Sequence, residues 1–122
     1  MEKNISLNYG SGGALTKKLI NEIILKYFKS TELKKLNDSA IIKTKSNLLA
    51  FTTDSYVIKP LFFPGGDIGK LAICGTVNDL SVQFAKPLFI SVGLIIEEGL
   101  SFFDFEKIIK SMAETSKKAG VE

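Results

Sequence analysis

Residues 68–84 (IGKLAICGTVNDLSVQF) constrain the fold more than any other stretch, because they are mostly apolar and carry small side chains at short intervals. These small residues are Gly69, Ala72, Gly75 and Ser81. A helix that is apolar around most of its circumference must be covered on several sides, so we expect a helix here that other elements enclose. Gly75 and the β-branched pair after it lower the helix propensity, and Lys86-Pro87 ends the segment.

Two further helices are predicted, one before and one after this segment. Residues 14–28 carry apolar side chains on adjoining stripes at helical spacing, directly after a glycine-rich turn. Ser101 and Asp104 have the spacing of a capping box, and apolar residues recur at helical spacing from there until Gly120, which should stop the helix. Each helix should therefore lay one face on a core.

Other segments favour extended structure: residues 39–45, 48–54, 56–58 and 88–97. The first two are joined across Ser46-Asn47, which predicts a hairpin. Residues 88–97 form a nearly continuous apolar run, which is typical of a strand buried on both faces. Residues 62–67 (FFPGGD) have the composition of a loop, and we expect Phe62-Phe63 to cover a partner or another part of the chain.

The chain has 122 residues and a hydrophobic content of 45%, which is enough for one domain with its own core. We therefore expect a single α+β domain over residues 1–122. The sequence stops just after Gly120, where another strand should begin, so we expect the N-terminal half of a longer protein. No apolar run is long enough to span a bilayer, and no signal peptide is visible, which makes the cytoplasm the default location and a membrane partner unexpected.

Composition excludes several kinds of site. The chain has no histidine, which removes Ser-His-Asp and Cys-His catalysis and His-ligated zinc. Cys74 is the single cysteine, so no intrachain disulfide can form, and its apolar neighbours predict a small buried core residue. All 16 basic residues are lysine, and without arginine or tryptophan a nucleic-acid partner is not expected. Acid–base or metal chemistry must fall to carboxylates, lysine or tyrosine.

Four aspartates stand at the edges of predicted elements: Asp38, Asp54, Asp67 and Asp79. A helix cap or a turn explains each of them alone. Several carboxylates that converge without arginine would repel one another unless a divalent cation bridged them, and Mg²⁺ prefers such oxygen ligands. Asp79 is the strongest candidate, because it lies in an apolar stretch where solvation is least available. Asp67 is the weakest, because a turn accounts for it.

The residues Gly10, Ser11, Gly12 and Gly13, called the glycine turn below, open the first predicted helix. Their backbone N–H groups could approach phosphate oxygens at the positive end of the helix dipole. The spacing matches neither the P-loop nor the dinucleotide-binding pattern, so a flexible N-terminal turn explains it equally well.

Several segments taken together resemble the HypE family of hydrogenase maturation factors. They are the glycine turn and residues 38–40, 51–55, 62–80 (FFPGGDIGKLAICGTVNDL) and 93–99. The resemblance covers nearly the whole chain, and its long central block is the most specific part. It implies membership in the superfamily of aminoimidazole ribonucleotide synthetase, selenophosphate synthetase and thiamine monophosphate kinase, which transfer phosphate from ATP to oxygen or selenium.

The resemblance implies a PurM-like N-terminal domain, with a mixed four-stranded sheet that carries helices on one face. The sheets of two copies would pair into a barrel across a homodimer, with ATP and Mg²⁺ along the interface. Carried over position by position, Asp38, Asp54 and Asp79 would be Mg²⁺ ligands. Asp54, Asn78 and the glycine turn would lie near the nucleotide.

The resemblance also implies a reaction and partners. The family uses ATP to dehydrate a thiocarbamate on its own C-terminal cysteine to a thiocyanate, the source of a cyanide ligand of the [NiFe] centre, and works with the carbamoyltransferase HypF and the HypC–HypD complex. The Gly-Asp-Thr segment and the Pro-Arg-Ile-Cys tail of the family are absent here, so we expect this chain alone not to complete the reaction, and its catalytic residue stays unknown. Ala14 stands where a lysine is usual, and Lys17 or Lys18 would have to compensate.

Two alternatives remain open at this point. The chain could be a non-catalytic dimerisation and docking module for maturation partners, which the incomplete site and an expected exposure of Phe62-Phe63 favour. It could also belong to another branch of the superfamily, an ATP-dependent small-molecule kinase. That branch accounts for the aspartates equally well but for residues 62–67 less well.

Overall fold

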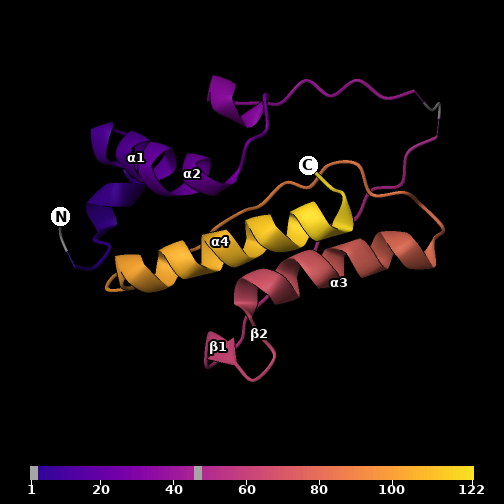
Figure 1. Cartoon of the computed structure of the whole chain (residues 1–122). Helices are drawn as coiled ribbons and strands as arrows, with labels where there is room; N and C mark the ends of the chain where they lie inside the picture. The colour runs from indigo at the N-terminus through magenta and orange to yellow at the C-terminus, as the bar shows by residue number, and fades with distance from the viewer. Residues whose placement is uncertain (1–2, 46–47) are drawn as a thin grey trace.

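The computed structural model describes residues 3–45 and 48–122, and its regular structure is mostly helical (Figure 1). The helical elements are η1 (Leu7–Gly10), α1 (Ala14–Leu19), η2 (Ile20–Ile24), α2 (Leu25–Tyr27), η3 (Leu33–Lys35), α3 (Ile68–Val82) and α4 (Phe102–Ala119). The strands are β1 (Phe62–Phe63) and β2 (Gly66–Asp67).

The helices α3 and α4 lie side by side, and the N-terminal helical run packs on α4 (Figure 1). Most of the core lies where these elements meet: Leu19, Ile23, Ile73, Phe105, Ile108, Ile109 and Met112. A methyl group at Gly69 would stand 2.6 Å from the carbonyl oxygen of Ile108, so the two helices approach closely because Gly69 has no side chain. The prediction that small residues make residues 68–84 a closely packed helix is confirmed for this end of α3.

The first predicted helix is also confirmed. α1, η2 and α2 follow one another without a break from Ala14 to Tyr27, with a π-helical turn in the middle, and Phe28 returns to extended backbone. Leu19 and Ile23 are buried on the face that the apolar stripe predicts. Gly13 is the N-cap, so the helix begins directly after the glycine turn.

The ends of α4 are set by the residues that the sequence indicated. The Ser101 hydroxyl oxygen accepts a hydrogen bond from the backbone N–H of Asp104 at 3.0 Å, as an N-cap does. Gly120 has a positive φ of 68° and ends the helix. The predicted N-cap and the predicted stop are therefore confirmed, and the Asp104 carboxylate accepts from the Ser101 hydroxyl at 2.8 Å.

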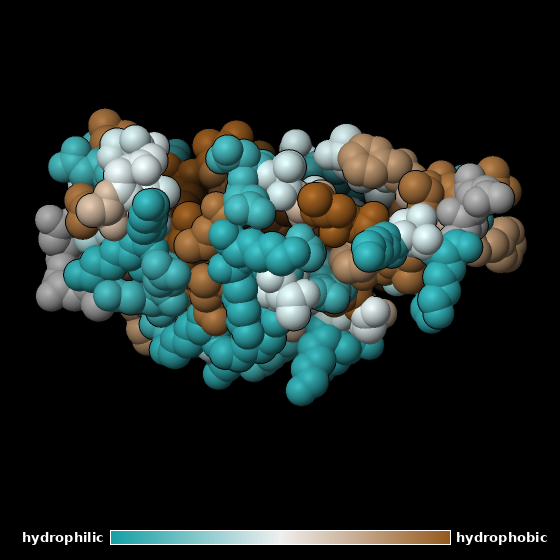
Figure 2. All heavy atoms as spheres, turned by 90° about the horizontal axis from the view of Figure 1, so that it is seen from above, coloured by the Kyte–Doolittle hydropathy of each residue, from teal (hydrophilic) through white to brown (hydrophobic). Residues whose placement is uncertain are grey.

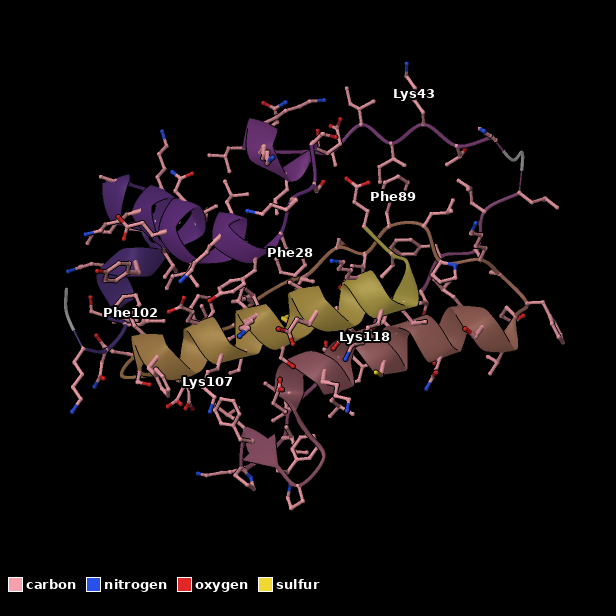
Figure 3. The ribbon with its side chains drawn as sticks, in the orientation of Figure 1. Phe28, Lys43, Phe89, Phe102, Lys107 and Lys118 are labelled. Carbon is pink, nitrogen blue, oxygen red and sulfur yellow. The ribbon has the colours of Figure 1, made fainter. Side chains whose placement is uncertain are left out.

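The loop expected over residues 62–67 is instead a small antiparallel hairpin, in which Phe62 pairs with Asp67 and Phe63 with Gly66. Its strands are too short to show an alternating pattern, which is why composition indicated a loop. Phe62 is half-buried, and Lys107 of α4 lies 4.3 Å from the centre of its ring. Figure 3 shows Lys107 directed from α4 toward this hairpin.

The predicted four-stranded sheet is not confirmed, because the sheet within residues 3–45 and 48–122 is the pair β1 and β2. No strand is assigned in residues 39–45, 48–54, 56–58 or 88–97, and the turn of the expected hairpin, Ser46-Asn47, lies outside the described residues. A short backbone pairing does form at the beginning of the last segment, where Ile90 donates to Glu122 and Glu122 donates to Leu88. An apolar pattern favours extended chain, but a sheet also needs a neighbouring strand.

The prediction that residues 88–97 are buried on both faces is wrong for the single chain. Ile95 is fully exposed, and other large apolar side chains of the extended segments are exposed as well: Ile41, Leu48, Leu49, Phe51, Val57 and Val92. Figure 2 shows the molecule from above, and on this face apolar side chains lie uncovered between hydrophilic ones. Within residues 3–45 and 48–122, no second layer covers these side chains.

Among the helices of the described residues, none combines the length and the apolar character needed to cross a bilayer.

Candidate functional site

Asp54 and Asp79 come together at the side of α3, although they are far apart in the sequence. Hydrogen bonding with Asp54, together with repulsion between the two carboxyls, raises the pKa of Asp79. Both residues are exposed to solvent. Asp79 is therefore not a buried charge, and the argument that its apolar neighbours desolvate it is wrong: α3 turns this residue toward the surface while Ile73 lies in the core.

Hydroxyl groups hold the two carboxyls in place. The Tyr56 hydroxyl donates to Asp54 Oδ2 at 3.0 Å, and the Thr52 hydroxyl donates to Asp79 Oδ2 at 3.4 Å. Thr76 Oγ1 lies 3.4 Å from the Tyr56 oxygen. We call Asp54, Asp79 and these three hydroxyl residues the aspartate site. No sequence motif singles out the three hydroxyl residues, although Thr52 and Tyr56 flank Asp54 at a spacing of two.

The donor set of the aspartate site fits Mg²⁺. It offers carboxylate oxygens, which are the hard ligands that Mg²⁺ takes, and the repulsion between the two carboxyls is what a divalent cation would relieve. Mg²⁺ in nucleotide sites is held by one or two carboxylates plus phosphate oxygens, so a pair is enough. A third acidic ligand is not supplied here, since no group of three His, Cys, Asp or Glu residues suited to a metal occurs among residues 3–45 and 48–122. Asp38 is exposed and lies outside the pair.

The glycine turn is tied to its own helix by Thr16. The Thr16 hydroxyl accepts from the backbone N–H of Gly12 at 2.9 Å and donates to the carbonyl oxygen of Tyr9 at 2.7 Å. A methyl group at Gly10 or Gly12 would meet no atom within 4 Å, so the outer surface of the turn is open. The turn is therefore shaped by a local hydroxyl, a type of contact common at helix starts, and is accessible from solvent.

The aspartate site and the glycine turn lie at opposite ends of the helical layer (Figure 1). Tyr9, just before the turn, meets the ring of Phe102 edge to face at 5.1 Å, at the beginning of α4. Figure 3 labels Phe102 at this end. Asp79 and its exposed neighbour Asn78 lie near the last residues of α3, at the other end. One chain thus brings Asp54, Asp79 and Asn78 to one region, but not the glycine turn.

Asp67 is a structural residue, as its position in a turn indicated. Its Oδ1 accepts from the backbone N–H of Gly69 at 2.7 Å and of Lys70 at 3.2 Å, which caps α3. Its Oδ2 accepts from the Ser111 hydroxyl at 2.6 Å. The carboxylate is occupied by these donors and does not belong to the aspartate site.

Cys74 is exposed, which contradicts the prediction of a buried core cysteine. It lines an open groove of about 360 Å³ between α3 and α4, together with Lys70, Ser111, Glu114, Thr115, Lys118 and Ala119. The apolar neighbours of Cys74 in the sequence include Ile73, which takes the core position, and one residue further along α3 the side chain faces outward.

Comparison with known proteins gives a consistent result. The family model for the AIR synthase related protein, N-terminal domain, matches residues 36–122. The carbamoyl dehydratase HypE of Escherichia coli (strain K12) is 47% identical over 123 residues, covering 97% of this chain and 37% of that protein. A hydrogenase expression/formation protein of Methanocaldococcus jannaschii is 49% identical, covering 96% of this chain and 37% of that protein.

Solved structures agree with the sequence comparison. HypE in complex with ATP matches with a TM-score of 0.92 at 46% identity, covering 95% of this chain and 34% of that one. A HypE–HypF complex matches with a TM-score of 0.57 at 48% identity, covering 89% of this chain and 33% of that one.

The chain therefore belongs to the AIR synthase related family and carries its N-terminal domain. Within that family it is similar to the hydrogenase maturation protein HypE, so the resemblance inferred from the central block is confirmed, and the fold is that of the HypE N-terminal region. The chain spans just over a third, 37%, of the length of these curated relatives.

Proposed function

We propose that this chain is the N-terminal, ATP-binding and dimer-forming domain of a HypE-like hydrogenase maturation protein. The observation that carries the proposal is the contact between Asp54 and Asp79, two carboxyls of like charge that meet at the surface. A related HypE has been solved in complex with ATP, which supports a nucleotide as the ligand. ATP brings phosphate oxygens, and with them the remaining ligands that a Mg²⁺ ion held by two carboxylates needs.

In this proposal each part of the chain has a defined task. Asp54 and Asp79 hold Mg²⁺, whose role when bound is to neutralise phosphate charge. Asn78 and the glycine turn bind near the phosphates, the turn through the open surface over Gly10 and Gly12. Asp38 is the third proposed ligand, and assembly must bring it to the pair, because no group of three such ligands forms among residues 3–45 and 48–122 of the single chain.

A homodimer would resolve two features of the single chain. The uncovered apolar residues of segments 41–57 and 88–95, among them Phe51 and Ile95, need a partner surface, since patches of this kind mark association sites. Pairing between copies would also add neighbouring strands to these segments, and so build the four-stranded sheets and the barrel. The glycine turn of one copy could then face the aspartate site of the other.

For the whole protein we propose the carbamoyl dehydratase reaction. Transfer of phosphate from ATP to the amide oxygen of the cysteine thiocarbamate turns a poor leaving oxygen into a good one. Loss of phosphate and two protons then leaves the thiocyanate. This chain would supply the nucleotide half of that site, in the cytoplasm, while HypF and the HypC–HypD complex supply the carbamoyl group and take the product. The HypE–HypF complex among the similar structures supports the first of these partners.

One second function has an observation in its favour. The separation of the glycine turn from the aspartate site fits a dimerisation and docking module that does not bind a nucleotide by itself. The two functions differ in one measurable property, which is whether the chain binds ATP in a Mg²⁺-dependent manner.

The test is titration calorimetry of the full chain with ATP, with and without Mg²⁺, and with the mass in solution measured on the same sample. The proposal expects a dimer that binds ATP only with Mg²⁺, and expects Asp79→Asn to remove that dependence. Wild-type affinity of the Asp79→Asn variant for Mg²⁺-ATP would contradict the metal assignment. A dimer that ignores ATP would favour the docking module.

A further inference from the structure

We infer that Tyr56 is a positioning residue for the cation site: its hydroxyl fixes the Asp54 carboxylate in the orientation that faces Asp79, and Gly75 provides the space for it. The inference rests on the proposed function, because it assigns a role within the same site. It adds a residue and a packing requirement that the aspartates alone do not reveal.

The contacts of the Tyr56 hydroxyl show how it acts on Asp54. It donates to Asp54 Oδ2 at 3.0 Å, and its oxygen lies 3.4 Å from Thr76 Oγ1 on α3. Since a phenol hydroxyl has one proton, donation to Asp54 leaves the oxygen to accept from Thr76. Two hydrogen bonds thus run in series from Thr76 to Tyr56 and from Tyr56 to Asp54. They connect Asp54, which lies in an irregular segment, to helix α3.

Gly75 is the second, independent observation. A methyl group at this position would stand 2.2 Å from the Tyr56 hydroxyl oxygen and 2.8 Å from the ring carbon that bears it. Any side chain larger than hydrogen would push the hydroxyl off its place. Glycine costs a helix interior about 1 kcal/mol relative to alanine, so its presence in the middle of α3 has a packing reason.

The chemistry of the site needs such a donor. A phenol hydroxyl keeps its proton at neutral pH, so Tyr56 remains a donor to the carboxylate. A carboxylate accepts through two oxygens, and a hydrogen bond to Oδ2 still leaves capacity for a cation. Outer groups that orient metal-binding carboxylates typically contribute 10- to 100-fold in metal affinity.

Tyr27 provides a matched control within the same chain. Its hydroxyl also donates to a carboxylate, Glu106, at 2.7 Å, but on the N-terminal helical run and away from the aspartate site. Tyr27→Phe and Tyr56→Phe therefore remove the same type of bond. A purely structural role for Tyr56 would make the two variants alike in every measurement.

The experiment measures the Mg²⁺ concentration that gives half-maximal ATP binding to the full chain by calorimetry, with the thermal unfolding midpoint recorded for each variant. We expect Tyr56→Phe to raise that concentration roughly tenfold and Tyr27→Phe to leave it unchanged, although both lose one hydrogen bond. Gly75→Ala keeps the hydroxyl but displaces it, and should weaken Mg²⁺ dependence in the same direction as Tyr56→Phe.

The outcomes separate this inference from the proposed function. If Asp79→Asn removes the Mg²⁺ dependence while Tyr56→Phe stays within about twofold of wild type, the role of Tyr56 is overturned and the metal site stands. If Tyr27→Phe weakens Mg²⁺ binding as much as Tyr56→Phe, the effect is structural and the inference is again overturned. If ATP binding by the wild type does not depend on Mg²⁺, both the proposed metal site and the role of Tyr56 are overturned.

Discussion

The Asp67 carboxylate accepts a hydrogen bond from the Ser111 hydroxyl at 2.6 Å, so the residue that caps the beginning of α3 is also fastened to the middle of α4. The two longest helices are held in register by this carboxylate and by the close approach at Gly69. Both contacts can be tested without reference to function.

Asp67→Ala should lower the free energy of unfolding by about 2 kcal/mol, because it removes an N-cap worth about 1 kcal/mol and a side-chain hydrogen bond of similar size. Urea unfolding measures the loss. Ser111→Ala should cost roughly half as much. Asp38→Ala, at an exposed position, is the control and should change stability by less than about 0.5 kcal/mol. Equal losses for Asp67→Ala and Asp38→Ala would show that the cap contributes little.

Gly69→Ala should destabilise the chain by about 1–3 kcal/mol, since the added methyl group would stand 2.6 Å from the backbone carbonyl of Ile108 and α4 would have to shift. The higher helix propensity of alanine works against this effect, so a net loss is a strict test. Gly93→Ala, where a methyl group meets no atom within 4 Å, is the matched control in the same denaturation experiment. A stabilised Gly69→Ala variant would mean that the helices are not so close.

Metal-free stability should fall as pH rises through the pKa of Asp79. This pKa is raised in the folded chain by the hydrogen bond to Asp54 and by their repulsion, so the folded state holds the proton more tightly than the unfolded state. The stabilisation that comes from protonated Asp79 is complete below the pKa of the unfolded state, about 4, and is lost as pH rises through the pKa of the folded state.

Thermal unfolding in a chelator at about pH 4 and about pH 7 checks this prediction. Relative to wild type, Asp79→Asn should become more stable at the higher pH, whereas Asp38→Asn should follow wild type at both. A difference between Asp79→Asn and wild type that does not change with pH would contradict the coupling of the two carboxyls.

Glu106 should show the opposite pH dependence. Hydrogen bonds from Lys26 and Tyr27 lower its pKa, so its contribution is present above the unfolded pKa and is lost as pH falls through the folded value. The side chain is 34% exposed, and we therefore expect Glu106→Gln to cost only about 0.5–1 kcal/mol at neutral pH. Chemical denaturation of both proteins should give converging stabilities below about pH 4; a constant difference would show that charge is not involved.

Ile95→Gln should weaken self-association without weakening the fold, because the Ile95 side chain is fully exposed in the single chain and the proposed dimer would cover it. We expect the dissociation constant to rise at least tenfold, which corresponds to about 1.4 kcal/mol. Light scattering over a dilution series gives the constant. Phe103→Gln, on an exposed position of α4, is the control. The two variants should differ; identical dissociation constants would place the interface elsewhere.

The helices could be predicted from sequence with little error, because their signals act within a few residues. The stripe over residues 14–28, the cap at Ser101 and the stop at Gly120 all lie where the structure has them. The hairpin of β1 and β2 was missed, since two residues per strand carry no periodicity. The expected strands failed for another reason: an apolar pattern favours extended chain, but a strand also needs a paired neighbour, and the described part of the chain pairs only β1 with β2 in a sheet.

At the candidate site, the sequence by itself determined which chemistry is available: without histidine, and with aspartates next to turns and hydroxyls, only oxygen ligands can serve a cation. The tertiary structure alone decided which aspartates meet. It brings Asp54 next to Asp79, makes Asp67 the cap of α3, and places the Tyr56 hydroxyl against Gly75. Residue type sets which bonds a side chain can make, whereas contact between distant positions depends on how α3 packs against the rest of the chain, and local sequence signals do not contain that information.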